Sequence, residues 1–287
     1  MKTIKLLVLL CAISLLSLHA EDAKPAQILF FTKSTRFEHS VIKQADGKPS
    51  FAEKILEEMS PKGNFKITTT KDGGAFTAEN LAKYDAIMMY TSGNLLLPKS
   101  IDNSAPMTEE GKKLLIESVK AGKPLIIVHN ALATFDRNPA GVIDPYVEML
   151  GGESIGHGAQ QKAHNTCVDP KFPGFADVKE GFELMEEWYS NKNFAKDIHV
   201  ILVQDPKGMT GGIYDRPAYP STWARMFGKG RVFVTSLGHR EDVWTNPMFQ
   251  SILNGGIQWS LGRVEADITP NMDTVTPEAA SLPKSTK

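Results

Sequence analysis

The feature that most constrains the fold of this 287-residue chain is a repeated alternation of short apolar runs with amphipathic stretches. Residues 27–32, 86–90 and 125–129 are almost continuously apolar, which is typical of strands buried on both faces. Residues 50–60 and 108–121 instead carry apolar side chains at helical spacing. This strand–helix–strand order predicts an α/β fold with a mostly parallel sheet and helices on both faces.

The second half of the chain is richer in strands. Gly228-Lys229-Gly230 is a plausible hairpin turn between two of them, and Asn246-Pro247 is expected to start a helix that ends near residue 261. Beyond Arg263 the chain is polar and contains several prolines, so residues 264–287 are expected to form a loosely held tail. The strands expected in this half are 163–168, 182–189, 199–204, 222–227 and 230–236.

The first twenty residues have the layout of a secretory signal peptide. Lys2 and Lys5 precede an almost wholly apolar run over 6–18, and a small residue, Ala20, stands before Glu21. An uncleaved N-terminal membrane anchor is the alternative, although the run is short for a bilayer. We therefore expect a signal peptide over 1–20, one domain over 21–263, export to the periplasm or the extracellular space, and no membrane contact after cleavage.

Charge and cysteine content restrict the function further. Of 32 basic residues, 30 remain once Lys2 and Lys5 are removed, against 33 acidic ones, and no basic block is present. Nucleic acid is therefore not an expected partner. Only Cys167 would remain in the mature chain, so no internal disulfide can form and the fold must depend on its core.

Histidines stand where several predicted strands end. His39 comes shortly after the first strand, His129 ends the strand at 125–129, and His239 follows the last strand. In an open parallel sheet, ligands bind beyond the carboxyl ends of the strands, so these side chains are expected to meet in one cavity. Glu187 and His157, the latter in a glycine-rich loop, are candidates for the same edge.

Six short motifs in this order resemble the ThuA-like (trehalose utilisation) proteins, and together they span residues 27–262. The resemblance implies a flavodoxin-like fold related to the class I glutamine amidotransferases. The family usually has Asp-Glu where this chain has Glu186-Glu187, so a carboxylate is kept. The matching segments are Arg36-Phe37-Glu38-His39, Val128-His129-Asn130-Ala131, Leu150-Gly151-Gly152 through His157, Glu186-Glu187-Trp188-Tyr189, Ala224-Arg225 through Phe233, and Leu237-Gly238-His239 followed by Trp244 and Asn246-Pro247.

The resemblance also indicates what this chain does not do. In the related amidotransferases a cysteine at the turn from strand to helix attacks the amide. Here the comparable turn reads Val128-His129-Asn130-Ala131, and Cys167 falls in a different strand. Glutamine amidotransfer and cysteine proteolysis are therefore not expected.

Two roles for the histidines stay open. In the first, His39, His129 and His239 exchange protons with a sugar, with Glu187 as the partner carboxylate. In the second, a divalent metal such as zinc is held by some of these histidines, by His157 or by Glu187. The sequence lacks a short-range pair such as HxH or HExxH, so spacing alone does not decide between the two roles.

The resemblance implies a carbohydrate enzyme, an isomerase or hydrolase acting on a keto-sugar or disaccharide. The alternative is a sugar-binding module without catalysis, and the sequence leaves a homo-oligomer open. Tryptophan and tyrosine rings could stack on sugars or simply pack in the core, and the arginines could bind substrate or pair on the surface. The substrate-binding candidates are Arg36, Asn130, His157, Trp188, Tyr189, Arg225 and Trp244.

Overall fold

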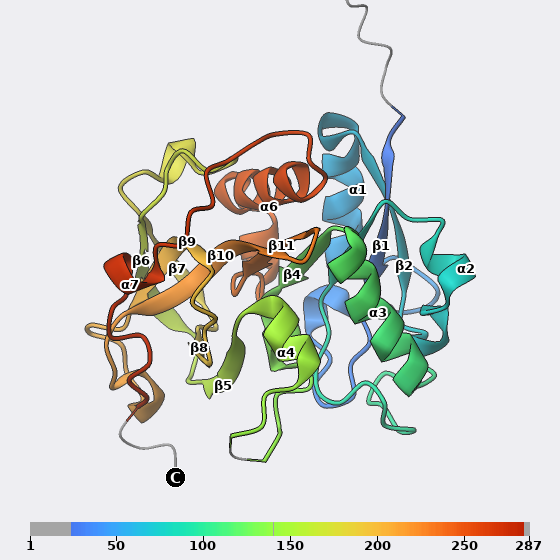
Figure 1. The fold of residues 1–287 in the computed structure, drawn as a ribbon, viewed down its shortest axis with the longest axis horizontal. Coiled ribbons are helices and arrows are strands. Elements are labelled where there is room, and N and C mark those ends of the chain that lie inside the picture. Colours follow the sequence, from blue (N-terminus) through green and yellow to red (C-terminus); the bar gives the residue numbers. More distant parts are fainter. Residues whose placement is uncertain (1–23, 140, 284–287) are drawn as a thin grey trace, which may run out of the picture.

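The chain, described here by a computed structural model of residues 24–139 and 141–283, is built around one large sheet (Figure 1). The segment expected to be a signal peptide lies outside the described residues. The strands are β1 Ala26–Phe31, β2 Phe65–Thr70, β3 Ala86–Met89, β4 Leu125–Val128, β5 Glu153–His157, β6 Gln161–Cys167, β7 Phe182–Glu186, β8 Tyr189–Lys192, β9 His199–Asp205, β10 Tyr219–Phe227 and β11 Gly230–Thr235. The helices are α1 Phe51–Gly63, α2 Ala78–Leu81, α3 Glu109–Ala121, α4 Pro145–Leu150, α5 Glu241–Trp244, α6 Pro247–Ser260 and α7 Met272–Val275.

The large sheet has two halves of different character. Its strand order is β2-β1-β3-β4-β11-β10-β9-β6-β7. The strands from β2 to β11 run parallel, whereas β10, β9, β6 and β7 each pair antiparallel with their neighbours. The predicted flavodoxin-like α/β class is confirmed, and the strand-rich second half forms the antiparallel extension.

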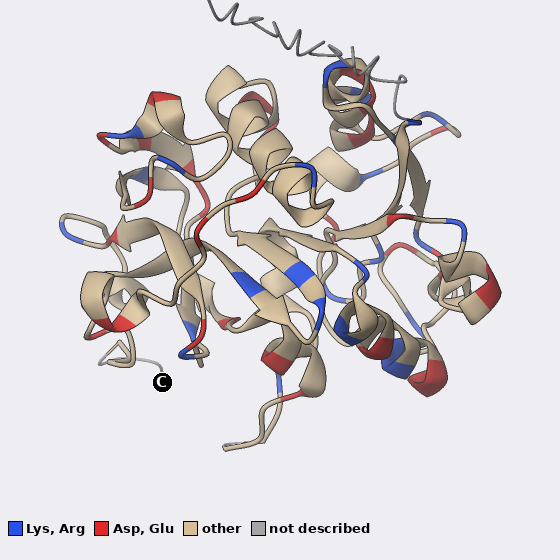
Figure 2. Ribbon diagram, turned by 45° about the horizontal axis from the view of Figure 1, so that its top comes forward, with Lys and Arg blue, Asp and Glu red and all other residues tan. Residues whose placement is uncertain are grey.

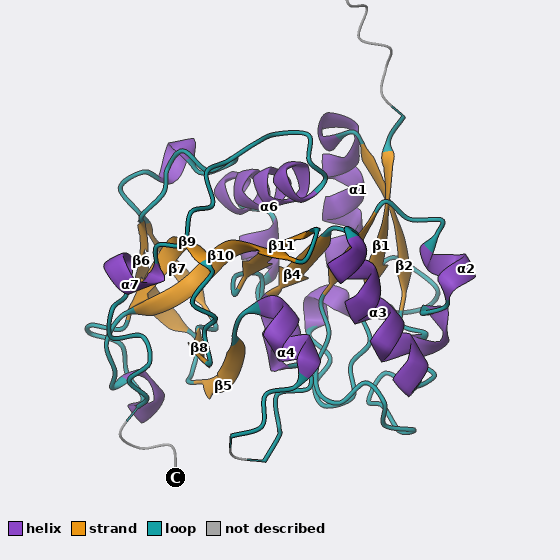
Figure 3. Cartoon of the chain, viewed as in Figure 1, coloured by secondary structure: helices purple, strands orange, loops and turns teal. Residues whose placement is uncertain are grey.

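Helices cover both faces of the parallel half (Figures 1 and 3). Alternate residues of β1 show why: Ile28 and Phe30 pack in the core with α1 and α6, whereas Leu29 and Phe31 pack in the core with α3 and α4. Successive side chains of a strand point to opposite faces, so a strand between two helix layers must be apolar at every position. The apolar runs in the sequence are continuous because both faces of these strands are covered by helices.

Local capping sets the starts of the three long helices where the sequence predicts them. The Ser50 side chain caps α1 and Glu53 completes a capping box, while Thr108 accepts from the Gly111 backbone N–H at 2.9 Å at the start of α3. Asn246 caps α6, which begins at Pro247. Each capping side chain satisfies a backbone N–H that has no partner within the helix.

Two predictions about the second half are corrected. The predicted strand 182–189 is two strands, because β7 ends at Glu186 in the large sheet and β8 begins at Tyr189 in a separate two-stranded sheet with β5. The glycine-rich loop expected around His157 contains β5, the other strand of this small sheet. The short connection Glu187-Trp188 crosses between the sheets, and this crossing turns Glu187 out of the strand.

Residues 264–283, which the sequence predicts to be a loosely held tail, make hydrogen bonds to other parts of the described chain. The Asn271 side chain accepts from the Val200 N–H at 2.7 Å and donates to its carbonyl at 3.0 Å, so it replaces a neighbouring strand along β9. Arg216 donates to the carbonyl of Ala279, which is buried. The polar composition of residues 264–287 predicts a loosely held tail. In the structure, the Asn271 side chain of this segment bonds to the backbone of β9.

The described surface carries charges of both signs. Figure 2 shows Lys and Arg interspersed with Asp and Glu, as on α3, where Lys113 and Glu117 lie 3.9 Å apart. Among residues 24–139 and 141–283, no helix has the length and apolar character required to cross a bilayer.

Candidate metal centre

Three histidines meet at the carboxyl edge of the parallel strands, as the sequence predicts. His39 follows β1, His129 follows β4 and His239 follows β11. The ring centroid of His39 lies 4.9 Å from those of both His129 and His239, and the latter two are 5.3 Å apart. Tyr90, after β3, packs beneath His39 and His129 and donates to the Gly238 carbonyl. The segments after four neighbouring parallel strands thus supply Tyr90 and the three histidine rings.

Glu187 brings a carboxylate into the centre of these rings. Its Oε2 atom lies 3.6 Å from Nε2 of His39, 3.5 Å from Nε2 of His129 and 3.2 Å from Nδ1 of His239. The turn between β7 and β8 is what places it there.

These four side chains have the geometry of a metal site. One donor atom from each lies within 4.8 Å of all the others. All four atoms are buried and lack a hydrogen-bond partner among the described residues. An unsatisfied buried polar group costs about 1–3 kcal/mol, so four facing one another need a common partner. Three imidazole nitrogens and one carboxylate oxygen form a donor set suited to zinc and to other first-row divalent metals. The group could therefore hold a metal ion.

The surroundings of His39, His129 and Glu187 favour the protonation states that a metal requires. Removal from water lowers the pKa of His39, and lowers that of His129 to about 3, so both rings are neutral at pH 7. Burial by itself raises the pKa of Glu187, but the imidazoles of His129, His239 and His39 outweigh it and hold that pKa well below its usual range. A metal requires neutral imidazole and ionised carboxylate.

The backbone around His129 orients its ring. His129 adopts φ 48°, in the left-handed region that residues other than glycine seldom occupy. This turn begins a short 3-10 helix, His129–Ala133, and places Nδ1 at 2.8 Å from the Ser236 carbonyl. Since a carbonyl only accepts, Nδ1 carries the proton and Nε2 presents a lone pair to the centre. This turn is the one at Val128-His129-Asn130-Ala131, where the sequence has no cysteine.

A second carboxylate, that of Glu186, binds the backbone on which two of the candidate ligands lie. Its Oε2 accepts from the N–H groups of Gly238 and His239 at 3.0 and 3.2 Å, and its Oε1 accepts from the Glu187 N–H at 2.8 Å. Burial raises the pKa of Glu186 to about 7, against the lowering effect of these donors. Glu186 therefore ties the backbone of two candidate ligands together.

A cavity of about 460 Å³ opens beside the centre. His157 stands at its edge with Nδ1 at 3.2 Å from Oε1 of Glu187, on the side away from the three histidines, and its side chain is 39% exposed. It is therefore not one of the four converging residues. Tyr189 donates to Asn130 at 2.8 Å within the wall. The predicted residues that line the cavity are Arg36, Asn130, His157, Glu187 and Tyr189.

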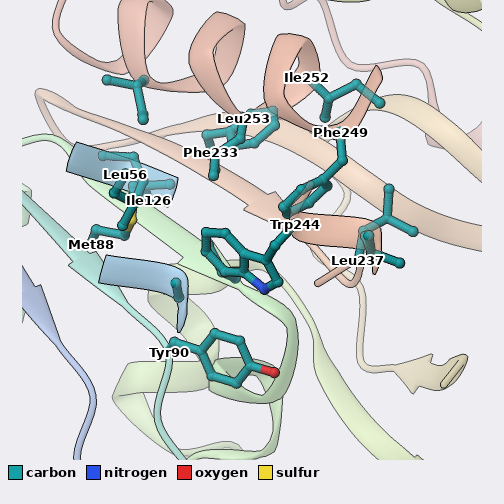
Figure 4. Close-up of a cluster of buried hydrophobic side chains, with 14 of the residues drawn as sticks. Leu56, Met88, Tyr90, Ile126, Phe233, Leu237, Trp244, Phe249, Ile252 and Leu253 are labelled. Atoms are coloured by element: carbon teal, nitrogen blue, oxygen red, sulfur yellow. The ribbon is translucent and has the colours of Figure 1, made fainter. Parts of the chain in front are cut away.

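The structure places three predicted substrate-binding residues elsewhere. Trp244 is buried in the hydrophobic core against Phe249 (Figure 4), and Trp188 is also buried. Arg225, on β10, bonds to the carbonyl of Glu148 and to Asp197. The tryptophan rings lie in the core and the guanidinium in an ion pair, and none of the three residues lines the cavity beside the centre.

The fold brings to the cavity further residues that the sequence patterns do not single out. Phe37 is 54% exposed, lines the cavity and packs edge-on against His39 at 4.8 Å between ring centroids. Asp136, Arg137 and Lys192 line it as well. Only Phe37 had a signal in the sequence, because it lies inside the motif that contains Arg36 and His39.

Comparison with known proteins gives one family and several similar folds. The family described as ThuA, trehalose utilisation, matches residues 27–260. A ThuA-like protein from Bacteroides uniformis is 18% identical, with a TM-score of 0.62 over 86% of this chain and 96% of that chain. A ThuA-like protein from Parabacteroides merdae is 17% identical, with a TM-score of 0.59 over 85% and 93%. No curated protein sequence matches the chain.

Proposed function

This chain belongs to the ThuA, or trehalose utilisation, family, and on that premise we propose that it is an exported, metal-dependent enzyme that processes a keto-sugar or a disaccharide. The observation that carries the proposal is the set of four buried donor atoms, from His39, His129, Glu187 and His239, beside an open cavity. Buried polar atoms without partners are expensive, and their position next to a cavity of ligand size favours chemistry there.

Zinc is the metal that we propose for this site. Bound there, it would supply a Lewis acid that polarises a sugar carbonyl or acidifies a water molecule. The chain itself supplies orientation: the Ser236 carbonyl holds the His129 ring, and Glu186 holds the backbone at Glu187, Gly238 and His239. These contacts preorganise the ligands before any substrate arrives.

The cavity walls supply groups that can bind a sugar. The Phe37 ring offers an exposed apolar face for a sugar ring, and the Asn130 amide is held by Tyr189. His157 is partly exposed at the cavity edge, and its Nδ1 lies 3.2 Å from Oε1 of Glu187, so its ring can form a hydrogen bond with a bound sugar.

Covalent catalysis by cysteine forms no part of this proposal. Cys167 is buried on β6, and burial raises the pKa of its thiol to about 11, so it is protonated at neutral pH. His129, and not a cysteine, begins the turn after β4. Export remains part of the proposal on the basic and apolar pattern of residues 1–20.

Elemental analysis together with turnover tests this proposal. We expect about one zinc per purified chain, loss of zinc in His129→Ala, and retention in His164→Ala, a matched change at a histidine outside the centre. Incubation with oxidised and unoxidised disaccharides, followed by NMR and mass analysis, should show conversion by the native chain and by His164→Ala only.

The contrary outcomes are distinct. A native chain that neither contains nor takes up zinc, manganese or iron would overturn the metal site. Zinc bound at one equivalent, with sugar bound but never converted, would favour the sugar-binding module.

A further inference from the structure

A second cavity adjoins the one beside the candidate metal centre. Its volume is about 480 Å³, and it shares Arg36, Asp136 and Arg137 with the first cavity. It extends toward the start of α3, where Glu109 and Lys112 line it, and toward Leu97 in the segment after β3. The two cavities therefore lie side by side with these three residues as a common wall.

An ion pair forms this common wall. Arg36 donates from Nη1 and Nη2 to the two carboxylate oxygens of Asp136, at 3.2 and 2.9 Å, and also to the Ala133 carbonyl at 2.7 Å. Bidentate bonding fixes the orientation of both side chains. Both remain partly exposed, with 28% and 12% of the side chains accessible, so they can still meet a ligand that lies across them.

The charges of the second cavity are balanced. Lys112 lies 2.6 Å from Asp144 and 4.0 Å from the centre of the Phe135 ring. Glu109 and Arg137 add one charge of each sign to the lining. Such a lining offers both hydrogen-bond donors and acceptors without net charge. It therefore suits a neutral ligand rich in hydroxyl groups better than a phosphate or a carboxylate.

We infer that this second cavity is the binding site for a second sugar unit, so that the substrate is a neutral disaccharide or a longer saccharide. The unit that reacts lies in the first cavity, against Phe37 and beside the histidine–glutamate centre. The bond between the units passes over the Arg36–Asp136 pair, and the other unit lies between Leu97 and the start of α3. The inference rests on the proposed function, since it takes the first cavity to be the sugar site.

Binding measurements with trehalose and glucose on the full chain test the inference. The native chain should bind trehalose at least about tenfold more tightly than glucose, about 1.4 kcal/mol. Leu97→Trp places a large ring in the second cavity and should reduce trehalose affinity to that of glucose, with glucose affinity unchanged. Ile101→Trp is the matched control, because Ile101 is exposed nearby and does not line either cavity. Its affinities should equal those of the native chain.

Calorimetric titration gives these affinities without relying on turnover. Equal binding of the two sugars by the native chain, binding of neither, or an unchanged ratio in Leu97→Trp would each overturn the second sugar site. Loss of zinc or of turnover with this pattern intact would instead count against the proposed function alone. Thermal unfolding of both tryptophan variants verifies that a change in affinity does not come from a folding defect.

Discussion

At the scale of single residues, the candidate centre depends on groups that are not ligands themselves but hold the ligands in place. His129 presents Nε2 to the centre because the Ser236 carbonyl takes its other ring nitrogen. Glu186 plays the same part for the backbone, with one carboxylate accepting from three N–H groups. Both carboxylate oxygens of Glu186 thus hold the backbone of Glu187, Gly238 and His239 in place.

We predict that Glu186→Gln lowers zinc affinity by roughly 10–100-fold. Glutamine keeps one acceptor oxygen but turns an NH2 group toward a backbone donor, which misplaces Glu187 or His239. Glu186→Asp should recover most of the affinity because both oxygens return. Competition with a zinc-sensitive dye measures the constants. Equal affinity in the glutamine variant and the native chain would show that Glu186 does not position the ligands.

At the scale of elements, the site is a product of how strands end. β1, β4 and β11 stop at one edge, and each is followed by a turn that directs a histidine inward. The turn after β11 requires Gly238, whose φ of 117° is unfavourable for other residues. A Cβ there would lie 3.1 Å from Val128 and 3.3 Å from Phe249. The absent side chain lets this backbone approach the core and reach Glu186.

Gly238→Ala should therefore destabilise the fold and disturb the centre together. We expect a loss of about 2–4 kcal/mol in the free energy of unfolding, from backbone strain and tight packing combined, and reduced zinc content. Gly208→Ala is the control, since it has φ 82° but open space around it. That variant should lose only about 1–2 kcal/mol and keep its zinc. Urea unfolding and elemental analysis separate the two effects, and equal behaviour of the variants would contradict this account.

At the scale of the whole molecule, the antiparallel half of the sheet and the C-terminal segment support each other. Asn271 pairs with Val200 of β9, and His199 contacts the Thr269 carbonyl at 2.7 Å. Arg216 is buried without a carboxylate partner among the described residues and depends on carbonyl and hydroxyl acceptors, that of Ala279 included. The described segment after α6 is therefore bonded to β9 and to Arg216.

Removal of residues 264–287 should lower the free energy of unfolding by about 3 kcal/mol or more. Several hydrogen bonds of about 1 kcal/mol each disappear, and Arg216 is left with an unsatisfied buried group. Removal of 284–287 alone is the control and should have little effect. Both chains should retain zinc, because the hydrogen bonds that this segment makes lie away from the three histidines of the centre. Stability that is unchanged in the longer truncation, measured in urea, would show that the segment contributes nothing.

The sequence alone determined the features that depend on local patterns. Fully apolar strands required two helix layers, and the capping residues Ser50, Thr108 and Asn246 set where the long helices begin. The positions of His39, His129 and His239 after parallel strands also sufficed to predict that their rings meet, because parallel strands end at a common edge. These inferences need only the periodicity of strands and helices and the local hydrogen-bonding needs of the backbone.

Only the tertiary structure decided the remainder. Glu187, already a candidate from the sequence, reaches the three histidine rings because β7 and β8 belong to different sheets, whereas the sequence predicts one strand across them. Trp188 and Trp244 pack in the core, while Phe37 is exposed at the cavity, and aromatic character by itself does not distinguish these cases. Such outcomes depend on which surfaces meet across distant parts of the chain. That meeting is set by the packing free energy of the whole fold, which no local pattern carries.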